Sequence, residues 1–169
     1  MKSNILVYLG LGSNLGNKSL ILNQACKKLS AVILKDFRAS EIYETVPLLK
    51  MIQPNYYNQV VCGRTDLSPF HLMEECHKIE TQLGRVRKEH WGSRKIDLDI
   101  LSYGNLTISS EKLVIPHPEM EKRSFVLLPL LELSSDWIHP KSGHSIKMLW
   151  EKWLMNNNEK LPKVIKQKN

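Results

Sequence analysis

Residues 95–104, KIDLDILSYG, contain the alternation that decides the fold. Successive side chains of a strand point to opposite faces, so Asp97 and Asp99 share one face while the apolar residues between them line the other. The two carboxylates would stand about 6–7 Å apart at their roots, which is two residue rises. We therefore predict a strand with one apolar face toward a core and one acidic face.

The segments before this strand predict the rest of an α+β domain. Strands are expected at 5–10, 40–45 and 58–65, and helices at 18–30 and 69–84. Asn17 can cap the first helix, and the three glycines before it are expected in a turn. Ser68 can cap the second helix, which has Pro69 at its first position and Gly84 at its end. The order βαββαβ is that of a ferredoxin-like fold, an antiparallel sheet with helices on one face.

The C-terminal part adds helical elements to this arrangement. The apolar stretch 123–133 predicts a short helix that is interrupted at Pro129, and residues 145–154 predict an amphipathic helix. We expect a single domain over 1–160, followed by a basic tail, 161–169, that is polar and frayed.

Length and composition exclude several classes of protein. The 169 residues are 42% hydrophobic and 24% charged, which fits one soluble globular domain. No apolar run approaches the ~18 residues that span a bilayer, and the first residues lack the features of a signal peptide. The three cysteines form no CxxC pair. We therefore expect a reduced, cytoplasmic protein with no membrane partner.

The net charge of +7 is concentrated in two segments. Residues 84–95 carry five basic residues and one acidic residue, and residues 147–169 carry six lysines and two glutamates, a net +4 in each case. A nucleic-acid-binding protein usually spreads its positive charge over a broad face, so we expect no nucleic-acid partner. The segment 84–95 is the place where an anionic substrate is expected.

The glycine-rich stretch GLGSNLG at 10–16 resembles two nucleotide-binding motifs but has the register of neither. Its third glycine comes one residue late for GxGxxG. Five residues separate Gly10 from Gly16 where a Walker A loop needs four. A tight turn between a strand and a helix is the simpler interpretation, although the N-terminus of that helix could still favour an anion.

The acidic pair on the strand could be a metal site or an ordinary exposed pair. Two neighbouring carboxylates are unfavourable unless a cation lies between them, and hard oxygen ligands suit Mg²⁺ together with substrate phosphates. Basic residues adjoin the pair in the sequence: Arg85, Arg87, Lys88, Arg94 and Lys95. Arginine matches phosphate oxygens, whereas surface salt bridges would also explain the mixture. The residues alone favour a Mg²⁺-dependent phosphoryl-transfer enzyme.

Four stretches then identify a resemblance along nearly the whole chain. They are YLGLGSNLGN, YETVPLLKMIQPNYYNQVV, LGRVRKEHWGSRKIDLDIL and IPHPEMEKRSFVLLPLLEL. In this order they resemble the 6-hydroxymethyl-7,8-dihydropterin pyrophosphokinase family of folate biosynthesis. The resemblance implies a ferredoxin-like fold and transfer of the β,γ-diphosphate of ATP, the co-substrate, to the hydroxymethyl group of the pterin, releasing AMP.

The resemblance also implies roles for individual residues at the phosphate end of the site. Asp97 and Asp99 match the family's ligands of two Mg²⁺ ions, and Arg85 and Arg94 match arginines that contact the reacting phosphates. Other positions match residues at or near the nucleotide, namely Arg87, Trp91, His117 and Arg123. Small-molecule substrates and a monomeric enzyme are expected.

At the pterin end, the family sandwiches the ring between two aromatic side chains that match Tyr56 and Phe125. Asn58 can offer a donor and an acceptor to the ring edge. Three residues match the first loop beside the pterin, namely Thr45, Pro47 and Leu48. The sequence departs from the family at Ser93, where a proline is usual, and at 48–52, where relatives often carry a glycine; both departures concern loops.

Three other functions remain open on the residues alone. A ferredoxin-like nucleotidyl transferase or polymerase palm also binds two metal ions on strand carboxylates, but it would release pyrophosphate. An RNA-recognition domain shares the element order, but it needs exposed stacking aromatics that neither 58–65 nor 95–104 supplies. A non-catalytic scaffold would leave Asp97 and Asp99 unexplained.

Overall fold

The computed structural model describes residues 4–33, 35–47, 52–85 and 94–166. One antiparallel sheet has the strand order β5-β1-β4-β3-β8, and β2 also pairs with β4. Its strands are β1 (Ile5–Ser13), β2 (Lys35–Ala39), β3 (Ile42–Thr45), β4 (Tyr56–Thr65), β5 (Asp97–Tyr103) and β8 (Lys163–Ile165). The helices are α1 (Lys18–Val32), α2 (Pro69–Gln82), α3 (Ser124–Leu133) and α4 (Ile146–Asn156). A small second sheet of β6 (Ile108–Ser109) and β7 (Val114–Ile115) and the 3₁₀ turn η1 (Met120–Lys122) connect β5 to α3.

The order of elements as far as β5 confirms the ferredoxin-like prediction. The second strand of the βαββαβ unit is broken into β2 and β3, which both pair with β4. The central strands β1 and β4 carry the long ladder from Ile5–Thr65 to Ser13–Tyr57, and β5 pairs on the other side of β1. The α+β class and the antiparallel sheet are as expected from the sequence.

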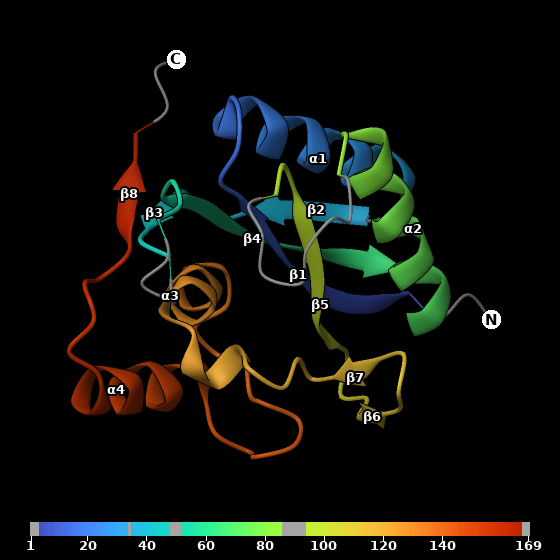
Figure 1. The fold of residues 1–169 in the computed structure, drawn as a ribbon. Coiled ribbons are helices and arrows are strands. Elements are labelled where there is room, and N and C mark those ends of the chain that lie inside the picture. The colour runs from blue at the N-terminus through green and yellow to red at the C-terminus, as the bar shows by residue number, and fades with distance from the viewer. Residues whose placement is uncertain (1–3, 34, 48–51, 86–93, 167–169) are drawn as a thin grey trace.

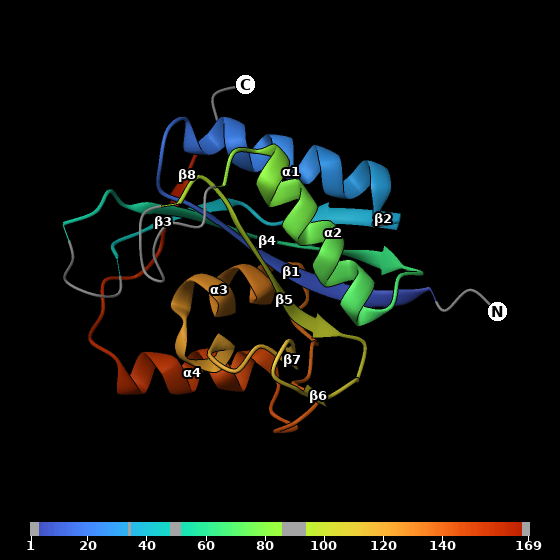
Figure 2. The same cartoon turned by 45° about the vertical axis from the view of Figure 1, so that its right-hand side comes forward.

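Helices cover both faces of this sheet. Figures 1 and 2 show α1 and α2 on one face and α3 with α4 on the other. The expectation of helices on one face holds for the βαββαβ unit, and the C-terminal helices form the opposite layer. Two separate apolar cores result, one under α1 and α2 and one between the sheet and the C-terminal layer. No helix in the described part of the chain is long and apolar enough to cross a membrane.

The predicted helix ends are confirmed by their caps. The side chain of Asn17 accepts a hydrogen bond from the Leu20 amide at 3.1 Å. Ser68 caps α2 in the same way, Pro69 begins that helix, and Gly84 follows it with a φ of 84°.

Two predictions of local structure were wrong and one strand was missed, because tertiary contacts override local signals. Gly10 and Gly12 lie inside β1, since this part of the strand pairs with β4 and β5 at once; only Gly16, with a φ of 67°, turns the chain. The strand β2 was not predicted, because its residues are mostly exposed and it forms by pairing with β4. Helix α3 continues through Pro129, whose ring lies buried in the C-terminal layer.

The tail 161–169 is not frayed throughout. Its residues Lys163–Ile165 form β8, which pairs with Ile42, Tyr43 and Glu44 of β3. The strand was missed in the sequence because three residues are too few to show an alternation of side chains.

Candidate active site

A pocket of about 360 Å³ lies on the face of the sheet against which α3 packs. Strands β1, β4 and β5, the end of β3 and the start of α3 contribute residues to its lining, as do the segments between them, among them Arg85, Arg94 and His117. Its two ends differ in chemistry. One end carries carboxylates and guanidinium groups, and the other carries aromatic rings and amides.

The middle of the pocket floor consists of two glycines opposite polar side chains. Gly12 pairs with Asn58 on one side and with Asp97 on the other, while Gly10 pairs with Asp99 one step along the ladder. Directly paired residues share a face of the sheet, so the absence of side chains at the glycines keeps this floor open. A Cβ atom at Gly12 would lie 3.4 Å from the Asn58 Oδ1 atom. Sequence reasoning assigned these glycines to a turn and missed this role; their alternation with Leu9 and Leu11 is the signal that could have found it.

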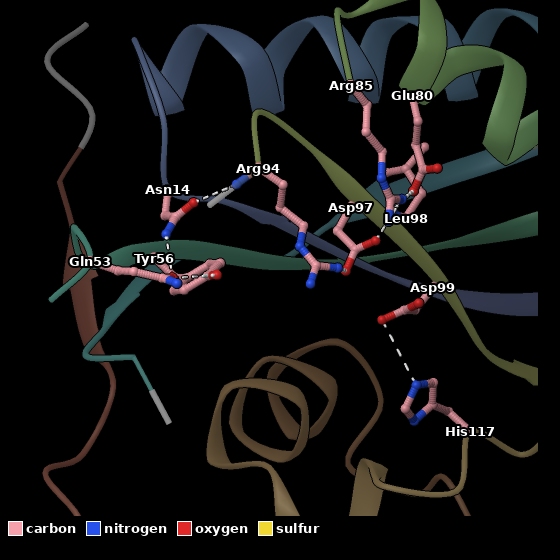
Figure 3. A network of polar contacts seen from close by, with 10 residues as sticks. All are labelled: Asn14, Gln53, Tyr56, Glu80, Arg85, Arg94, Asp97, Leu98, Asp99 and His117. Carbon is pink, nitrogen blue, oxygen red and sulfur yellow. Dashed lines mark hydrogen bonds and ion pairs between the residues drawn. The ribbon is translucent and has the colours of Figure 1, made fainter. Parts of the chain in front are cut away.

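Asp97 lies between two arginines. Arg85 Nη1 contacts one carboxylate oxygen at 2.8 Å, and Arg94 Nη1 contacts the other at 2.7 Å (Figure 3). Both guanidinium groups line the pocket. They present their charge to the same space as the carboxylate, which suits an anion that also carries a cation.

Glu80 contacts Arg85 at this end of the pocket and helps to hold it in position. This α2 residue is 1% exposed, accepts a hydrogen bond from the Leu98 amide at 2.7 Å and forms an ion pair with Arg85 (Figure 3). Burial raises the pKa of Glu80 to about 7. Sequence reasoning missed it, although an acidic residue directly after Ile79 in the apolar stripe of α2 is a visible signal.

Asp99 shares its face of β5 with Asp97, as the alternation predicted, while Leu98 and Ile100 enter the core under α1 and α2. Burial, and then the charge of Asp97, raise the pKa of Asp99 to about 6. His117 Nε2 lies 3.8 Å from Asp99 Oδ2, too far for a hydrogen bond. Burial lowers the pKa of His117 to about 4, so the imidazole is neutral at pH 7.

The carboxylate pair fits Mg²⁺. Two acidic side chains face one partly buried space and repel each other there, and a divalent cation would relieve both effects. Within the described residues no group of three or more His, Cys, Asp or Glu side chains is arranged to hold a metal ion. A magnesium ion commonly takes one or two carboxylates and completes its shell with water and substrate phosphates, so two protein ligands are sufficient.

The other end of the pocket holds the aromatic residues. Tyr56 of β4 donates to Gln53 Oε1 at 3.3 Å, and Phe125 of α3 lines the same pocket. Asn58 Nδ2 donates to Thr45 Oγ1 at 2.7 Å, which fixes the plane of its amide. Burial raises the pKa of Tyr56, so this hydroxyl stays protonated. Gln53 was not among the predicted site residues.

Asn14 connects the two ends. It is 1% exposed and pairs with Arg94 through two contacts, from its own amide to the Arg94 carbonyl at 3.2 Å and from the Arg94 amide to its Oδ1 atom at 2.9 Å. Its Nδ2 atom donates to Gln53 Oε1 at 3.3 Å (Figure 3). One buried amide at the end of β1 therefore positions the backbone of a predicted phosphate-binding arginine and a side chain beside Tyr56.

Eleven of the fourteen predicted site residues line this one pocket. They are Thr45, Pro47, Tyr56, Asn58, Arg85, Arg94, Asp97, Asp99, His117, Arg123 and Phe125. The other three, Leu48, Arg87 and Trp91, lie outside the described residues, as does Ser93. The lining brings together segments from β1 to α3 that are far apart in the sequence.

Comparisons with known proteins identify the relatives of this chain. Residues 8–135 match the model of a family described as 7,8-dihydro-6-hydroxymethylpterin-pyrophosphokinase (HPPK). The chain is 43% identical over 139 residues to the 2-amino-4-hydroxy-6-hydroxymethyldihydropteridine pyrophosphokinase of Haemophilus influenzae, an alignment that covers 82% of this chain and 87% of that protein. It is 46% identical over 149 residues to the folic acid synthesis protein fol1 of Pneumocystis carinii, covering 88% of this chain and 20% of that protein.

A solved structure shows the same fold at low sequence identity. The crystal structure of Plasmodium falciparum HPPK-DHPS with pteroate superposes with a TM-score of 0.75 at 16% identity, covering 92% of this chain and 43% of that one. The chain thus spans about a fifth of the fol1 protein and less than half of the Plasmodium protein. Since the family model covers most of the chain and the Haemophilus enzyme aligns over nearly its full length, this chain belongs to the 7,8-dihydro-6-hydroxymethylpterin-pyrophosphokinase family of enzymes.

Proposed function

We propose that this chain transfers the β,γ-diphosphate of ATP to the hydroxymethyl group of 6-hydroxymethyl-7,8-dihydropterin and releases AMP, as its place in the family suggests. The observation that carries the proposal is one pocket with two unlike ends. A carboxylate and arginine end suits a metal polyphosphate, and an aromatic and amide end suits a flat heterocycle. The hydroxymethyl group would lie where the two ends meet.

At the polyphosphate end, Arg85, Arg94 and Arg123 all line the pocket and supply positive charge to phosphate oxygens. Asp97 and Asp99 would hold two Mg²⁺ ions, which when bound neutralise phosphate charge and polarise the reacting groups. Glu80 and Asp97 keep Arg85 oriented, and Asn14 holds the backbone of Arg94. The roles that the resemblance implies for Arg87 and Trp91 stay predictions.

At the pterin end, Tyr56 and Phe125 offer ring faces to the heterocycle. The amide of Asn58 is oriented by Thr45, so it can present hydrogen-bonding groups to the ring edge in a fixed plane. Pro47 and Leu48 are the remaining residues proposed beside the pterin. Pre-oriented groups lose little entropy on binding, which favours a rigid planar ligand.

The proposed reaction is a displacement at the β-phosphorus of ATP. The hydroxymethyl oxygen forms a bond to that phosphorus and gives up its proton to water, while the bond to the oxygen that bridges the α- and β-phosphates breaks and AMP leaves with the electron pair. Arg85 and Arg94, which both line the pocket, would stabilise the charge that develops on the transferred group. The chemistry therefore depends on electrostatic stabilisation and alignment rather than on a covalent intermediate.

The test is a product assay with ATP, Mg²⁺ and 6-hydroxymethyl-7,8-dihydropterin that resolves AMP, ADP and pyrophosphate. Pterin-dependent AMP without free pyrophosphate is expected. ADP would indicate an ordinary kinase, and free pyrophosphate would indicate a nucleotidyl transferase. A folded, Mg²⁺-supplied sample without turnover would refute the enzymatic proposal and favour a binding module. The monomeric state and the cytoplasmic location stay predictions.

A further inference from the structure

The basic C-terminal tail has no part in the proposed chemistry, yet it reaches the active-site sheet. Strand β8 lies beside β3 at the edge of the sheet (Figure 1) and pairs with it over three residues. Without β8, β3 would itself be the edge strand, and it is only four residues long. The tail therefore covers the outer side of the strand that leads to Thr45.

One cross-strand row joins the tail to the centre of the pocket. Val164 of β8 pairs with Tyr43 of β3, Tyr43 with Asn58 of β4, Asn58 with Gly12 of β1, and Gly12 with Asp97 of β5. Paired residues in adjacent strands occupy the same face and set each other's position. Asn58, the pterin-side member of this row, lies two strands from the tail, and Asp97 lies four strands away.

The tail is held by packing as well as by pairing. Ile165 pairs with the fully buried Ile42 and packs against the core under α1 and α2, and Pro162 is buried. Lys163 and Glu44 are cross-strand partners of opposite charge. These contacts hold β8 against the sheet even though most of its residues are exposed.

Two residues at the end of β3 line both the large pocket and a small cavity beside the tail. A small cavity of about 30 Å³ lies between residues 160, 161 and 163, at the start of the tail, and the end of β3. Thr45 and Val46 line both this cavity and the large pocket. On its inner side, Thr45 accepts the hydrogen bond that orients Asn58. A shift of β3 toward the tail side would therefore move the partner of Asn58.

We propose that β8 is a positioning element for the pterin end of the active site: it holds β3 so that Thr45 keeps Asn58 oriented toward the pterin. This inference rests on the proposed function. Strand β3 stays paired with β4 and Tyr43 keeps a 2.7 Å hydrogen bond to Glu132 of α3, so detachment of β8 frees β3 on one side without unfolding the sheet. The pterin then binds only the fraction of molecules in which β3 is in place, while the polyphosphate end is unaffected.

The experiment is a series at Ile165 in the full-length chain: Ile165→Val, Ile165→Ala and Ile165→Asp. The dissociation constant of the pterin is measured in the presence of a non-hydrolysable MgATP analogue, and that of the analogue is measured alone. We expect pterin affinity to fall in the order Val, Ala, Asp, by about tenfold for Asp, because the competent fraction would drop to about a tenth. Affinity for the analogue and kcat at saturating pterin should stay within about twofold. Lys166→Ala, which removes a neighbouring charge outside the strand, is the matched control and should bind like the unaltered chain.

Hydrogen exchange of β3 amides reports whether β8 has detached. Faster exchange at Ile42–Thr45 with unchanged pterin affinity would overturn the inference, as would equal weakening of both ligands across the series. If Ile165→Asp does not fold, the graded loss in the Ala variant and its rescue in Val decide the matter in the same way. Failure of the unaltered chain to bind pterin or to form AMP would refute the proposed function itself, whereas pterin binding that is insensitive to Ile165 refutes this inference alone.

Discussion

The two faces of strand β1 serve different purposes in the same nine residues. Val7, Leu9 and Leu11 point into the core under α1 and α2, where all three are at most 3% exposed. On the opposite face, Gly10 and Gly12 form open floor of the pocket. The apolar residues of this strand therefore stabilise the fold, and the glycines that alternate with them leave room for the pocket.

The difference between the faces follows from how far each helical layer extends. Helices α1 and α2 cover their face with aliphatic side chains, whereas the core under α3 and α4 leaves the Asp97 end of the sheet uncovered. The charged groups of the pocket lie on the part of the sheet that α3 and α4 leave uncovered. Holding like charges in a partly buried place is unfavourable for the free protein, a cost that functional sites commonly carry. We therefore expect substitutions on the two faces to have opposite signatures.

The largest expected effect is a loss of catalysis when residues on the pocket face of the sheet are substituted. Asp97→Ala and Asp99→Ala each remove a proposed metal ligand, a loss of several kcal/mol of transition-state stabilisation, so turnover should fall at least about a thousandfold. The melting temperature should be unchanged or higher for Asp99→Ala, because a desolvated charge is removed. Steady-state AMP formation and thermal denaturation measure the two quantities.

The matched control is Asp136→Ala at an exposed position outside the pocket lining, which should keep full turnover. Near-normal activity of Asp97→Ala would refute the metal assignment.

Substitutions on the face of β1 that points into the core under α1 and α2 should show the opposite result, a loss of stability without a loss of catalysis. Leu9→Ala removes a fully buried side chain and should lower the free energy of unfolding by about 2–5 kcal/mol. Because Leu9 points away from the pocket, kcat of the folded enzyme should remain within about twofold. Urea denaturation and an assay well below the melting temperature test this pair of outcomes.

Leu20→Ala at a half-exposed position of α1 is the control and should change the free energy of unfolding by less than about 0.5 kcal/mol. A loss of kcat in Leu9→Ala without a loss of stability would contradict the division between the faces.

Glu80 sharpens the comparison, because it is the one fully buried acidic residue in the described part of the chain and it reaches from α2 to Arg85. Burial raises its pKa from an ordinary value of 4.5 to about 7. The folded state therefore binds more protons than the unfolded state between these values, so this group adds stability as the pH falls through 7 and its full contribution is present below about 4.5. Glu80→Gln removes this titration.

Relative to Glu80→Gln, the unaltered chain should gain on the order of 2 kcal/mol in unfolding free energy between pH 8 and pH 5. Denaturant titrations of both proteins at the two pH values isolate Glu80, since the contributions of Asp99 and His117 are common to both. A pH-independent difference would show that Glu80 does not titrate in this range.

The smallest expected effect is at the floor of the pocket. Gly12→Ala places a methyl group 3.4 Å from Asn58 Oδ1 and should raise the KM for the pterin by about threefold to tenfold, about 1 kcal/mol. Stability should not fall, because alanine restricts the unfolded chain and Gly12 lies in a regular strand. An unchanged KM would show that this floor position does not limit pterin binding.

Much of the site could be predicted because its chemistry is local in the sequence. The alternation of 95–104 predicted that Asp97 and Asp99 share a face, and the capping residues Asn17 and Ser68 predicted where both long helices begin. Caps and alternation depend on neighbours within a few residues, so they can be identified before the chain folds. The resemblance then grouped aromatic, amide and arginine positions that no local rule connects.

Other features could not be predicted because their cause is distant in the sequence. Strand β8 exists only through pairing with β3, more than a hundred residues earlier, and β2 exists through pairing with β4. Glu80 and Asn14 become site residues only when α2 and the end of β1 meet the segment that begins β5. None of these contacts produces a periodic pattern in the sequence that could predict it.

By itself, the sequence determined the βαββαβ order as far as β5, the starts of its two helices, the acidic face of β5 and the family of the chain. Only the tertiary structure decided which glycines would be floor rather than turn, that the tail would become a strand, and that a buried glutamate would orient Arg85. The physical reason is that side-chain period and capping act within one turn or strand. Pairing, burial and shared electrostatics arise when distant segments meet and exclude water from the same place.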